Sequence, residues 1–561
     1  MSKKIRSINR AKGQNFLRLS SLGLGLPAVL AAVPAAHAFQ LYDGSAHGNN
    51  VEINLNITAS YTGAVRVGKP TQILVNGAYN ANGNDGDANL QHGVVNDTFE
   101  VLPVLDIKDQ SFGMHFSGEY FVNTVYLRGT QNDQQSTINP VVDGNDFATQ
   151  TQTSNGHNGR LLDAFVYDSW NIGGDQQFTL KAGQQTLFWG QSLFSTDGIS
   201  GGQAPLDLVQ AQNLVNPQSQ QVFLPVGQIV ATYQPNSTYT IQGYYQYQWA
   251  PYSQQGVGSY FSTTDLLGPG GYRLIAVQTP GENFYLLKGK DLTPPSQNGQ
   301  FGLSVQAQYG NYDVGLFGLR YDAKLPSLYQ FAPTAFTPTP GGVGVGTYKW
   351  VYPRDIWLYG TSLSTTVGAT NIAGEVSIRT HDPLVGSSAA GTQTAANPGN
   401  ANNDPLYPVG NVMTGLVNAI YGSPALKYDP GGVTLLGEVE WDNVFRVTDN
   451  KALLAPGRTS QAADLDVEVE PAFFEVLPNL ELQFPVSVSY NFAGNSEVQT
   501  SMNHGTGSYS ASIVATYRES WDASLNYVGY FGKAGNNATV PETSAEAVDR
   551  SYISLNLQHT F

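Results

Sequence analysis

The sequence has no cysteine, few charged residues and no long apolar run after residue 33. The absence of cysteine excludes disulfides and lipid attachment at a cysteine. Asp, Glu, Lys and Arg make up 12% of the chain, whereas an ordinary soluble domain has about 25%. No later segment approaches the roughly 20 apolar residues that a transmembrane helix needs. Stability must therefore come from backbone pairing and packing, with apolar residues dispersed along the chain.

The first 38 residues have the composition of a signal peptide. Basic residues are followed by an apolar run over residues 22–33 and by Ala36-His37-Ala38. A membrane anchor is the competing interpretation, but this run is about a dozen residues long, which is too short to span a bilayer. We predict export, with cleavage after Ala38 and one domain over residues 39–561.

Basic residues are scarce in the predicted mature chain. The signal peptide contains six of the 27 Lys and Arg and none of the 43 Asp and Glu, which leaves 21 basic against 43 acidic residues. Nucleic acid is disfavoured as a partner because its phosphates need a basic surface.

Polar and apolar side chains alternate in many segments of about ten residues. The last segment, 551–561, places Leu555, Leu557 and Phe561 on one face, and residues 51–61 show the same alternation of polar and apolar residues. An exposed edge strand would aggregate unless a closed barrel paired it. The terminal Phe561 also resembles the insertion signal that the barrel-assembly machinery reads in outer-membrane proteins, although His559 departs from that pattern. The repetition predicts a transmembrane β-barrel.

Short and long connections alternate between these segments. Turn-sized joins lie at residues 171–175, 234–237 and 310–311, whereas residues 250–298 and 322–354 form long Gly-, Asn- and Pro-rich stretches. Outer-membrane barrels have short periplasmic turns and long external loops. We predict an all-β, antiparallel barrel of 16 to 18 strands, with 18 favoured, in contact with outer-membrane lipid and lipopolysaccharide.

A barrel of this size is too wide for its side chains to fill, so function is expected in the lumen. If apolar side chains face lipid, the alternate residues face inward. Rings of carboxylates in a pore favour cations; alternatively, the charges pair with one another and fill the lumen. The charged residues predicted to line it are Glu119, Glu375, Arg379, Glu438, Glu440, Asp442, Asp464, Asp466, Glu468 and Arg518.

Residues 187–224 form the most distinctive connection. Pro205 and the apolar residues after it predict a short helix that ends before Pro217. Such a helix must bury its apolar face, and the lumen offers the space. We predict that this loop folds inward, narrows the channel and brings Asp197, Asp207 and Gln210 near the path. The alternative is an external loop packed on its neighbours.

No residue pattern indicates an enzyme, a metal or a cofactor. His115 and Ser117 share an inward face, but positions two apart on one strand coincide by chance. The eight His residues lack metal-ligand spacing, and the Asn- and Asp-rich residues 80–87 lack the Gly and acidic residue of a calcium loop. We predict a protein without catalytic activity, metal or cofactor.

Several runs resemble one known family. They include RLLDAFVYDSW from Arg160, KAGQQTLFWGQSLF from Lys181, GGQAPLDLV from Gly201 and VYPRDIWLYG from Val351. They are similar to the proteobacterial, porin-like domain-of-unknown-function 1302 family of the outer membrane. The resemblance implies a porin-like barrel and apolar or amphipathic cargo, and it suggests a resistance-nodulation-division type exporter as a partner.

Two functions remain open from the sequence. The first is an outer-membrane channel that passes small solutes, amphipathic or hydrophobic ones among them, by diffusion through an acidic lumen. The second is a non-conducting component that binds or exports lipid or steroid together with a periplasmic or inner-membrane exporter. A measurement of conductance through the purified protein separates these two functions.

Overall fold

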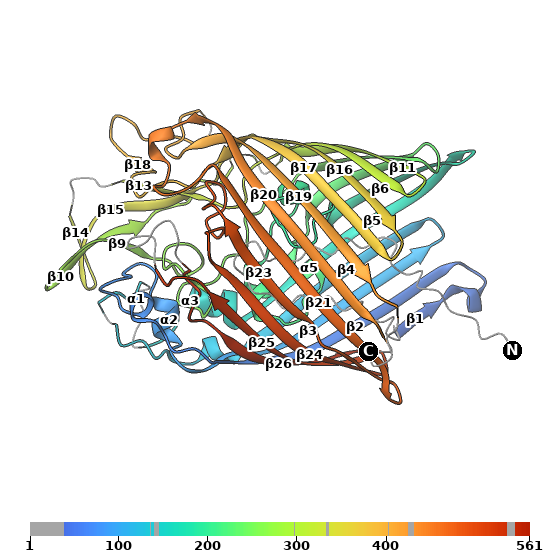
Figure 1. The fold of residues 1–561 in the computed structure, drawn as a ribbon, viewed down its shortest axis with the longest axis horizontal. Helices are drawn as coiled ribbons and strands as arrows, with labels where there is room; N and C mark the ends of the chain where they lie inside the picture. Colours follow the sequence, from blue (N-terminus) through green and yellow to red (C-terminus); the bar gives the residue numbers. More distant parts are fainter. Residues whose placement is uncertain are drawn as a thin grey trace.

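The computed structural model describes residues 39–561, except residues 135, 140–144, 295, 297, 332–335, 402, 425–430 and 536–544. The predicted signal peptide lies outside the described residues. Most of the described chain forms one closed antiparallel barrel of 18 strands (Figure 1), which confirms the predicted fold. Its walls are β2 (Val51–Arg66), β3 (Gly93–Asp109), β4 (Phe112–Asn123), β5 (His157–Gly173), β6 (Gln176–Gln185), β7 (Val226–Gln234), β8 (Tyr239–Gln246), β11 (Gln300–Tyr309), β12 (Tyr312–Tyr321), β16 (Ile356–Val367), β17 (Thr370–Pro383), β19 (Val409–Gly422), β20 (Val433–Asp449), β21 (Gln461–Leu477), β22 with β23 as one interrupted strand (Leu480–Gln483 and Val486–Ala493), β24 (Gly507–Tyr517), β25 (Trp521–Phe531) and β26 (Tyr552–Thr560).

The barrel closes between its first and last strands, as the shared alternation predicts. β26 pairs antiparallel with β2 from Thr58↔Thr560 to Arg66↔Tyr552, and the Phe561 N–H donates to the Ile57 carbonyl over 2.9 Å. The short strand β1 (Phe39–Asp43) pairs with the first part of β2. Closure leaves neither β2 nor β26 as an open edge.

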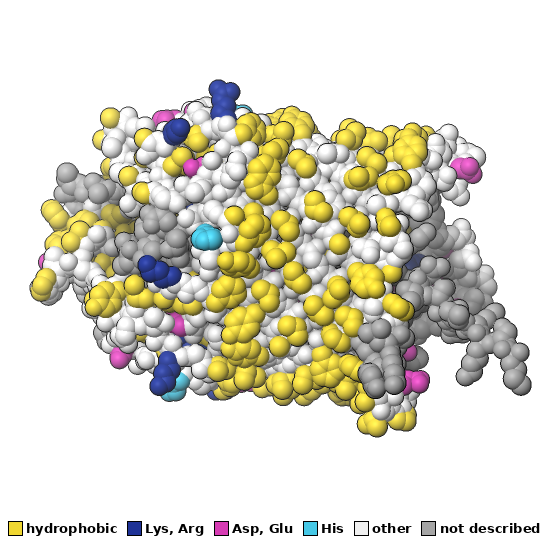
Figure 2. Space-filling model, viewed as in Figure 1, with side chains coloured by type: hydrophobic (Ala, Val, Ile, Leu, Met, Phe, Trp, Pro, Cys, Tyr) yellow, Lys and Arg dark blue, Asp and Glu magenta, His cyan; other side chains and the backbone are white. Residues whose placement is uncertain are grey.

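The two faces of each strand separate by polarity. On β26, Leu555 and Leu557 are 44% and 45% exposed, whereas Ser554 and Asn556 are buried. Apolar side chains cover the middle of the wall, and charged side chains gather toward its two ends (Figure 2). A wall that is apolar outside and polar inside matches a bilayer around an aqueous lumen.

The connections differ at the two ends of the barrel. Turns of two residues join β3 to β4, β11 to β12 and β16 to β17, as expected for the periplasmic side. At the other end the loops carry a second, six-stranded sheet of β9 (Arg273–Thr279), β10 (Glu282–Lys288), β13 (Ser327–Phe331), β14 (Thr337–Thr339), β15 (Gly342–Val351) and β18 (Thr392–Gln393) (Figure 1). The sequence predicts irregular loops here, and this is wrong for the strands of the second sheet. No local pattern indicates this sheet, because strands such as β10 and β15 come from different loops and pair only when those loops meet.

Short helices accompany these loops. They are α1 (Gln72–Val75), α2 (Asp85–Asn89), α3 (Thr149–Thr151), α4 (Leu208–Asn213) and α5 (Ser219–Val222), with single turns η1 (Gly44–His47), η2 (Thr124–Leu127), η3 (Gln152–Gly156), η4 (Ile199–Gly202) and η5 (Lys451–Leu453). None of the described helices is long and apolar enough to cross a membrane. Several of them pack over the loop end of the barrel, where Tyr126 and Tyr260 are fully buried.

Candidate functional site: the inner loop and the lumen wall

The connection between β6 and β7, residues 186–225, folds into the barrel as predicted, and we call it the inner loop. It contains η4, α4 and α5. Asp207 caps the start of α4, and its carboxylate accepts the N–H groups of Val209 and Gln210 over 2.8 and 3.0 Å. The Trp189 ring packs edge-on against Tyr244 of β8, and its Nε1 donates to Gln242 over 2.7 Å. The apolar part of the loop is therefore buried against the inside of the wall.

Glu438 of β20 holds one turn of the inner loop. Its carboxylate accepts three backbone N–H groups, from Leu193 and Ser195 over 2.7 Å each and from Phe194 over 2.9 Å. The Asn418 amide of β19 donates to the same carboxylate over 3.0 Å. Four donors around one carboxylate stabilise its charge where water is excluded. Glu438 thus faces the lumen, but the inner loop covers it.

Glu375 of β17 holds the next turn in the same way. It accepts the N–H groups of Gln191 and Ile199 over 2.6 and 2.7 Å. A Cβ atom at Gly190 or at Gly198 would lie 2.3 Å from one of its carboxylate oxygens. Only glycine fits so close to the carboxylate, so these two positions and Glu375 form one unit.

An ion pair fastens the tip of the loop to the wall. Arg379 of β17 pairs with Asp197 of the inner loop through both guanidinium Nη atoms, and its Nε lies 3.1 Å from Asp382. Its Nη2 also donates to the Thr414 hydroxyl over 2.9 Å. Arg379 is therefore engaged in fastening the loop to the wall.

A second polar cluster holds the other side of the loop. Glu119 of β4 accepts the Arg160 guanidinium over 2.6 Å and the side-chain amides of Gln210 and Gln221 over 3.1 and 3.0 Å. Arg160 also pairs with Asp207. The structure thus brings together the predicted residues Glu119, Asp207 and Gln210, and it adds Arg160 and Gln221, which no sequence pattern indicated.

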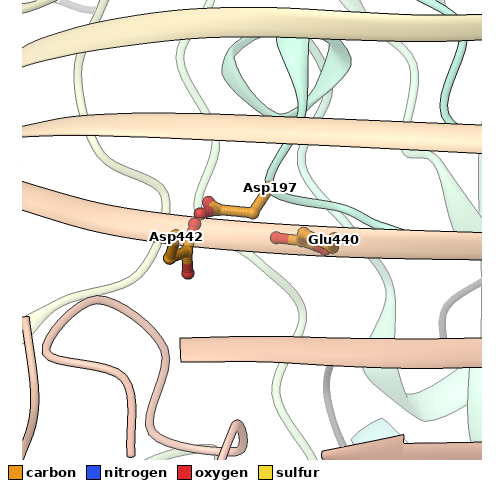
Figure 3. Close-up of side chains that lie close together, drawn as sticks. All are labelled: Asp197, Glu440 and Asp442. Atoms are coloured by element: carbon orange, nitrogen blue, oxygen red, sulfur yellow. The ribbon is translucent and has the colours of Figure 1, made fainter. Parts of the chain in front are cut away.

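The remaining predicted residues fall into two groups. One group is buried on the lumen faces of β20 and β21, and two of its members, Glu440 and Asp442, lie beside Asp197 of the loop (Figure 3). Arg518, by contrast, lies in the exposed turn between β24 and β25 with φ of 53°, and its guanidinium lies over the Tyr517 ring. It is off the lumen face because β24 ends one residue before it. The buried group is Glu440, Asp442, Asp464, Asp466 and Glu468.

Small polar side chains cover a third part of the wall, which we call the polar wall. They belong to β2, β24, β25 and β26, and the pattern of charged residues in the sequence does not indicate them because they carry no charge. The Ser512 Oγ, Asn526 Oδ1 and Asn556 Oδ1 atoms are buried and have no hydrogen-bond partner in the described structure. The members are Thr58, Ser60, Thr62, Ser508, Ser510, Ser512, Ser524, Asn526, Ser554 and Asn556.

The inner loop and the polar wall face each other across a narrow cavity of about 10 Å³, room for about one water molecule. Leu214 and Val215 line it from the loop, and Thr58, Ser60 and Asn556 line it from the wall. The space on this side is therefore narrow and mostly polar, because Asn216, Gln218 and Gln221 of the loop also line it.

His115 and Ser117 do not form a nucleophile and base. The Ser117 hydroxyl donates to Asp163 over 3.1 Å, and the His115 Nδ1 lies 2.8 Å from Asp106. A hydroxyl nucleophile needs a base that accepts its proton, most often a histidine. The His115 Nε2 also lies 3.9 Å from the Asp163 oxygen that accepts the Ser117 hydroxyl, and no contact joins Ser117 to His115 directly among the described residues. This pair therefore gives no support to catalysis.

A closed barrel with an apolar outer face, a polar lumen and an inward loop defines a transmembrane β-barrel of the outer-membrane type. The chain belongs to the family described as protein of unknown function (DUF1302), whose model matches residues 19–561. This confirms the resemblance found in the sequence. No curated protein matches the chain.

Solved structures to which the chain is similar include two named OpdK and OccAB4 and a BenF-like porin. OpdK of Pseudomonas aeruginosa, solved with vanillate, is 8% identical with a TM-score of 0.41, covering 91% of this chain and 98% of that chain. OccAB4 of Acinetobacter baumannii is 9% identical with a TM-score of 0.44, with the same coverage of 91% and 98%. A BenF-like porin of Pseudomonas fluorescens Pf-5 is 11% identical with a TM-score of 0.41, again covering 91% and 98%.

Proposed function

We propose that the protein is an outer-membrane channel for small solutes and that the inner loop narrows its lumen. The observation that carries this proposal is the polar wall, where buried oxygen atoms of Ser512, Asn526 and Asn556 lack a protein partner. Buried polar atoms without a partner are costly unless water or a solute reaches them. A hydrated path along this wall satisfies them.

The lining of the path supports amphipathic solutes. Leu214 and Val215 offer apolar contacts within a lining that is otherwise mostly polar and includes Ser60 and Asn556. The acidic side chains of β20 and β21 add negative potential, which favours cations over anions. Glu375 and Glu438 contribute less than the other carboxylates because backbone N–H groups of the loop surround them.

Planar-bilayer recordings of the purified protein test the channel. We expect discrete conductance steps that become larger when residues 200–214 are deleted. Replacing Asp464, Asp466 and Glu468 by their amides should lower cation selectivity. The matched control is the triple change Asp175→Asn, Asp313→Asn and Glu519→Gln, which removes three exposed carboxylates at the turn end. A silent barrel refutes conduction, and an unchanged reversal potential refutes the acidic filter.

The narrowness of the lumen favours a second candidate, a non-conducting component that binds lipid or steroid for an exporter. A hollow of about 340 Å³ on the outside of β7, β8, β11 and β12 is lined mostly by apolar side chains and glycines, among them Leu303, Gly243 and Gly318. A lipid or steroid that co-purifies with a silent barrel supports this candidate. Copurification with a resistance-nodulation-division type exporter would identify its partner.

A further inference from the structure

Three carboxylates from two distant parts of the chain converge inside the barrel. Asp197 comes from the inner loop, and Glu440 and Asp442 come from β20. Each contributes an oxygen atom to a group in which all oxygens lie within 4.8 Å of one another (Figure 3). Glu440 and Asp442 are each 1% exposed. Like charges at this spacing repel strongly in a site that water barely reaches.

Two buried oxygen atoms at this cluster have no hydrogen-bond partner. They are Oε2 of Glu440 and Oδ1 of Asp464, whose side chains are both about 99% buried. Glu440 and Asp464 are directly paired across β20 and β21, so their side chains share the lumen face. A buried carboxylate oxygen without a donor is costly, and here two of them lie beside the converging group.

Positive charge in the described surroundings is limited. Arg379 forms ion pairs with Asp197 and Asp382, so its charge is already divided between two carboxylates. The other donors at the centre are neutral, and among them the Thr414 and Ser496 hydroxyls donate to Asp442 over 2.8 and 3.3 Å. The Gln499 Nε2 atom lies 2.7 Å from Glu440, 3.1 Å from Asp442 and 3.5 Å from Asp197. A partly positive NH₂ group thus occupies the point toward which all three carboxylates are directed.

We propose that Asp197, Glu440 and Asp442 bind one hard divalent cation, for which Ca²⁺ is the best match. Calcium takes oxygen ligands at about 2.4 Å, so two ligands of one ion lie at most about 4.8 Å apart. The three carboxylates meet this limit. If the side-chain amide of Gln499 flips, its oxygen takes the place of its nitrogen and becomes a fourth ligand. Asp464 adds negative charge beside the site. Calcium tolerates such a mixed and irregular ligand set better than Mg²⁺ does.

The ion would join three elements. Asp197 belongs to the inner loop, Glu440 and Asp442 to the wall strand β20, and Gln499 to the loop between β23 and β24. Bound Ca²⁺ therefore locks the inner loop against the wall through residues other than those of the Glu119 cluster. This role does not depend on conduction, because it concerns the loop and not the solute.

Isothermal titration calorimetry with CaCl₂ on the full-length detergent-solubilised protein tests the site. We expect one Ca²⁺ per chain, and an affinity about a hundredfold weaker or more in the double variant Glu440→Gln, Asp442→Asn, because ligand charge sets calcium affinity. The control variant Asp175→Asn, Glu519→Gln removes two exposed carboxylates and should bind as the parent does. Calcium held by co-purified lipopolysaccharide would be common to all three proteins.

A second measurement uses the unaltered protein, so it does not depend on how the variants fold. Its thermal midpoint should rise with Ca²⁺ but not with K⁺ at equal ionic strength. The proposal is overturned if the parent protein binds no Ca²⁺, if its midpoint does not respond, or if the folded double variant keeps the parent affinity. Conductance is not a readout here, so failure of the channel proposal leaves this result interpretable.

Discussion

Replacing Glu438 by Gln removes the carboxylate that holds the inner loop. One carboxylate oxygen accepts the Phe194 and Ser195 N–H groups, and the other accepts those of Leu193 and the Asn418 amide. A glutamine amide keeps one acceptor oxygen and turns the other position into a donor. Whichever way it is oriented, two hydrogen bonds are lost and an NH₂ group faces other donors.

The loss of inner-loop stability in Glu438→Gln can be estimated from these contacts. A hydrogen bond to a charged group contributes about 1.5–3 kcal/mol, so two lost bonds correspond to about 3 kcal/mol or more. Since 1.4 kcal/mol changes an equilibrium tenfold, local opening of the loop should become about a hundredfold more frequent. The barrel wall should remain intact, because the ladder between β19 and β20 does not involve this side chain.

Hydrogen exchange read by mass spectrometry checks the effect at residues 190–199. We expect exchange of this peptide to accelerate about a hundredfold in Glu438→Gln, while peptides of β19 and β20 exchange at the parent rate. The control is Asp313→Asn, which removes an exposed carboxylate of β12 near the turn end and accepts no hydrogen bond from the inner loop among the described contacts. If the loop stays as protected as in the parent, Glu438 does not fasten it.

Three further predictions concern other parts of the molecule. Gly198→Ala places a methyl group 2.3 Å from a Glu375 oxygen, so it should loosen the loop at a cost of about 1–3 kcal/mol, seen by the same exchange assay. Gly437→Ala is the control because its nearest neighbour is 3.8 Å away, and equal protection in both variants contradicts the packing argument. Burial raises the pKa of Asp85, at the start of α2, to about 7. The buried site favours the protonated acid, so the stability of α2 should be highest at low pH and fall as the pH rises from about 4 to 7. Exchange at residues 84–90, corrected for its intrinsic pH dependence, should therefore be slower at pH 5 than at pH 8. Asp265 accepts the Asp85 N–H, and burial raises the pKa of Asp265 as well, so a pH response that persists in the double variant Asp85→Asn, Asp265→Asn refutes this assignment. Deleting Phe561 removes its N–H bond to Ile57 and should slow assembly, measured as the appearance of the heat-modifiable folded band. Assembly at the parent rate would show that Phe561 is dispensable.

The terminal strand shows how far local patterns reach. Its alternation predicts the outward face, and the structure places Leu555, Leu557 and His559 there. His559 departs from the insertion pattern, and the reason is visible only in three dimensions. Its ring stacks on Trp521 at 4.1 Å and meets Phe561 edge-on at 4.2 Å, and its Nδ1 lies 2.9 Å from the Ser520 carbonyl. The imidazole therefore serves as an aromatic residue of the outer face.

The inner loop shows where such patterns stop. Its composition predicts a short buried helix, and α4 is that helix. The partners of the loop cannot be predicted in the same way, because Gln191 meets Glu375 and Leu193 meets Glu438 across 184 and 245 residues of sequence. The same alternation that predicts inward carboxylates does not show which of them hold the loop and which do not.

The sequence by itself determined the barrel, its two faces, the alternation of short and long connections and the inward loop. These properties depend on strand periodicity and on turn chemistry, which act between neighbouring residues. Only the tertiary structure decided that Glu375 and Glu438 bind backbone N–H groups, that Arg518 lies in a turn, and that Asp197 meets Glu440 and Asp442. Those contacts depend on closing the barrel around a loop that is distant in sequence, and no local pattern records that geometry.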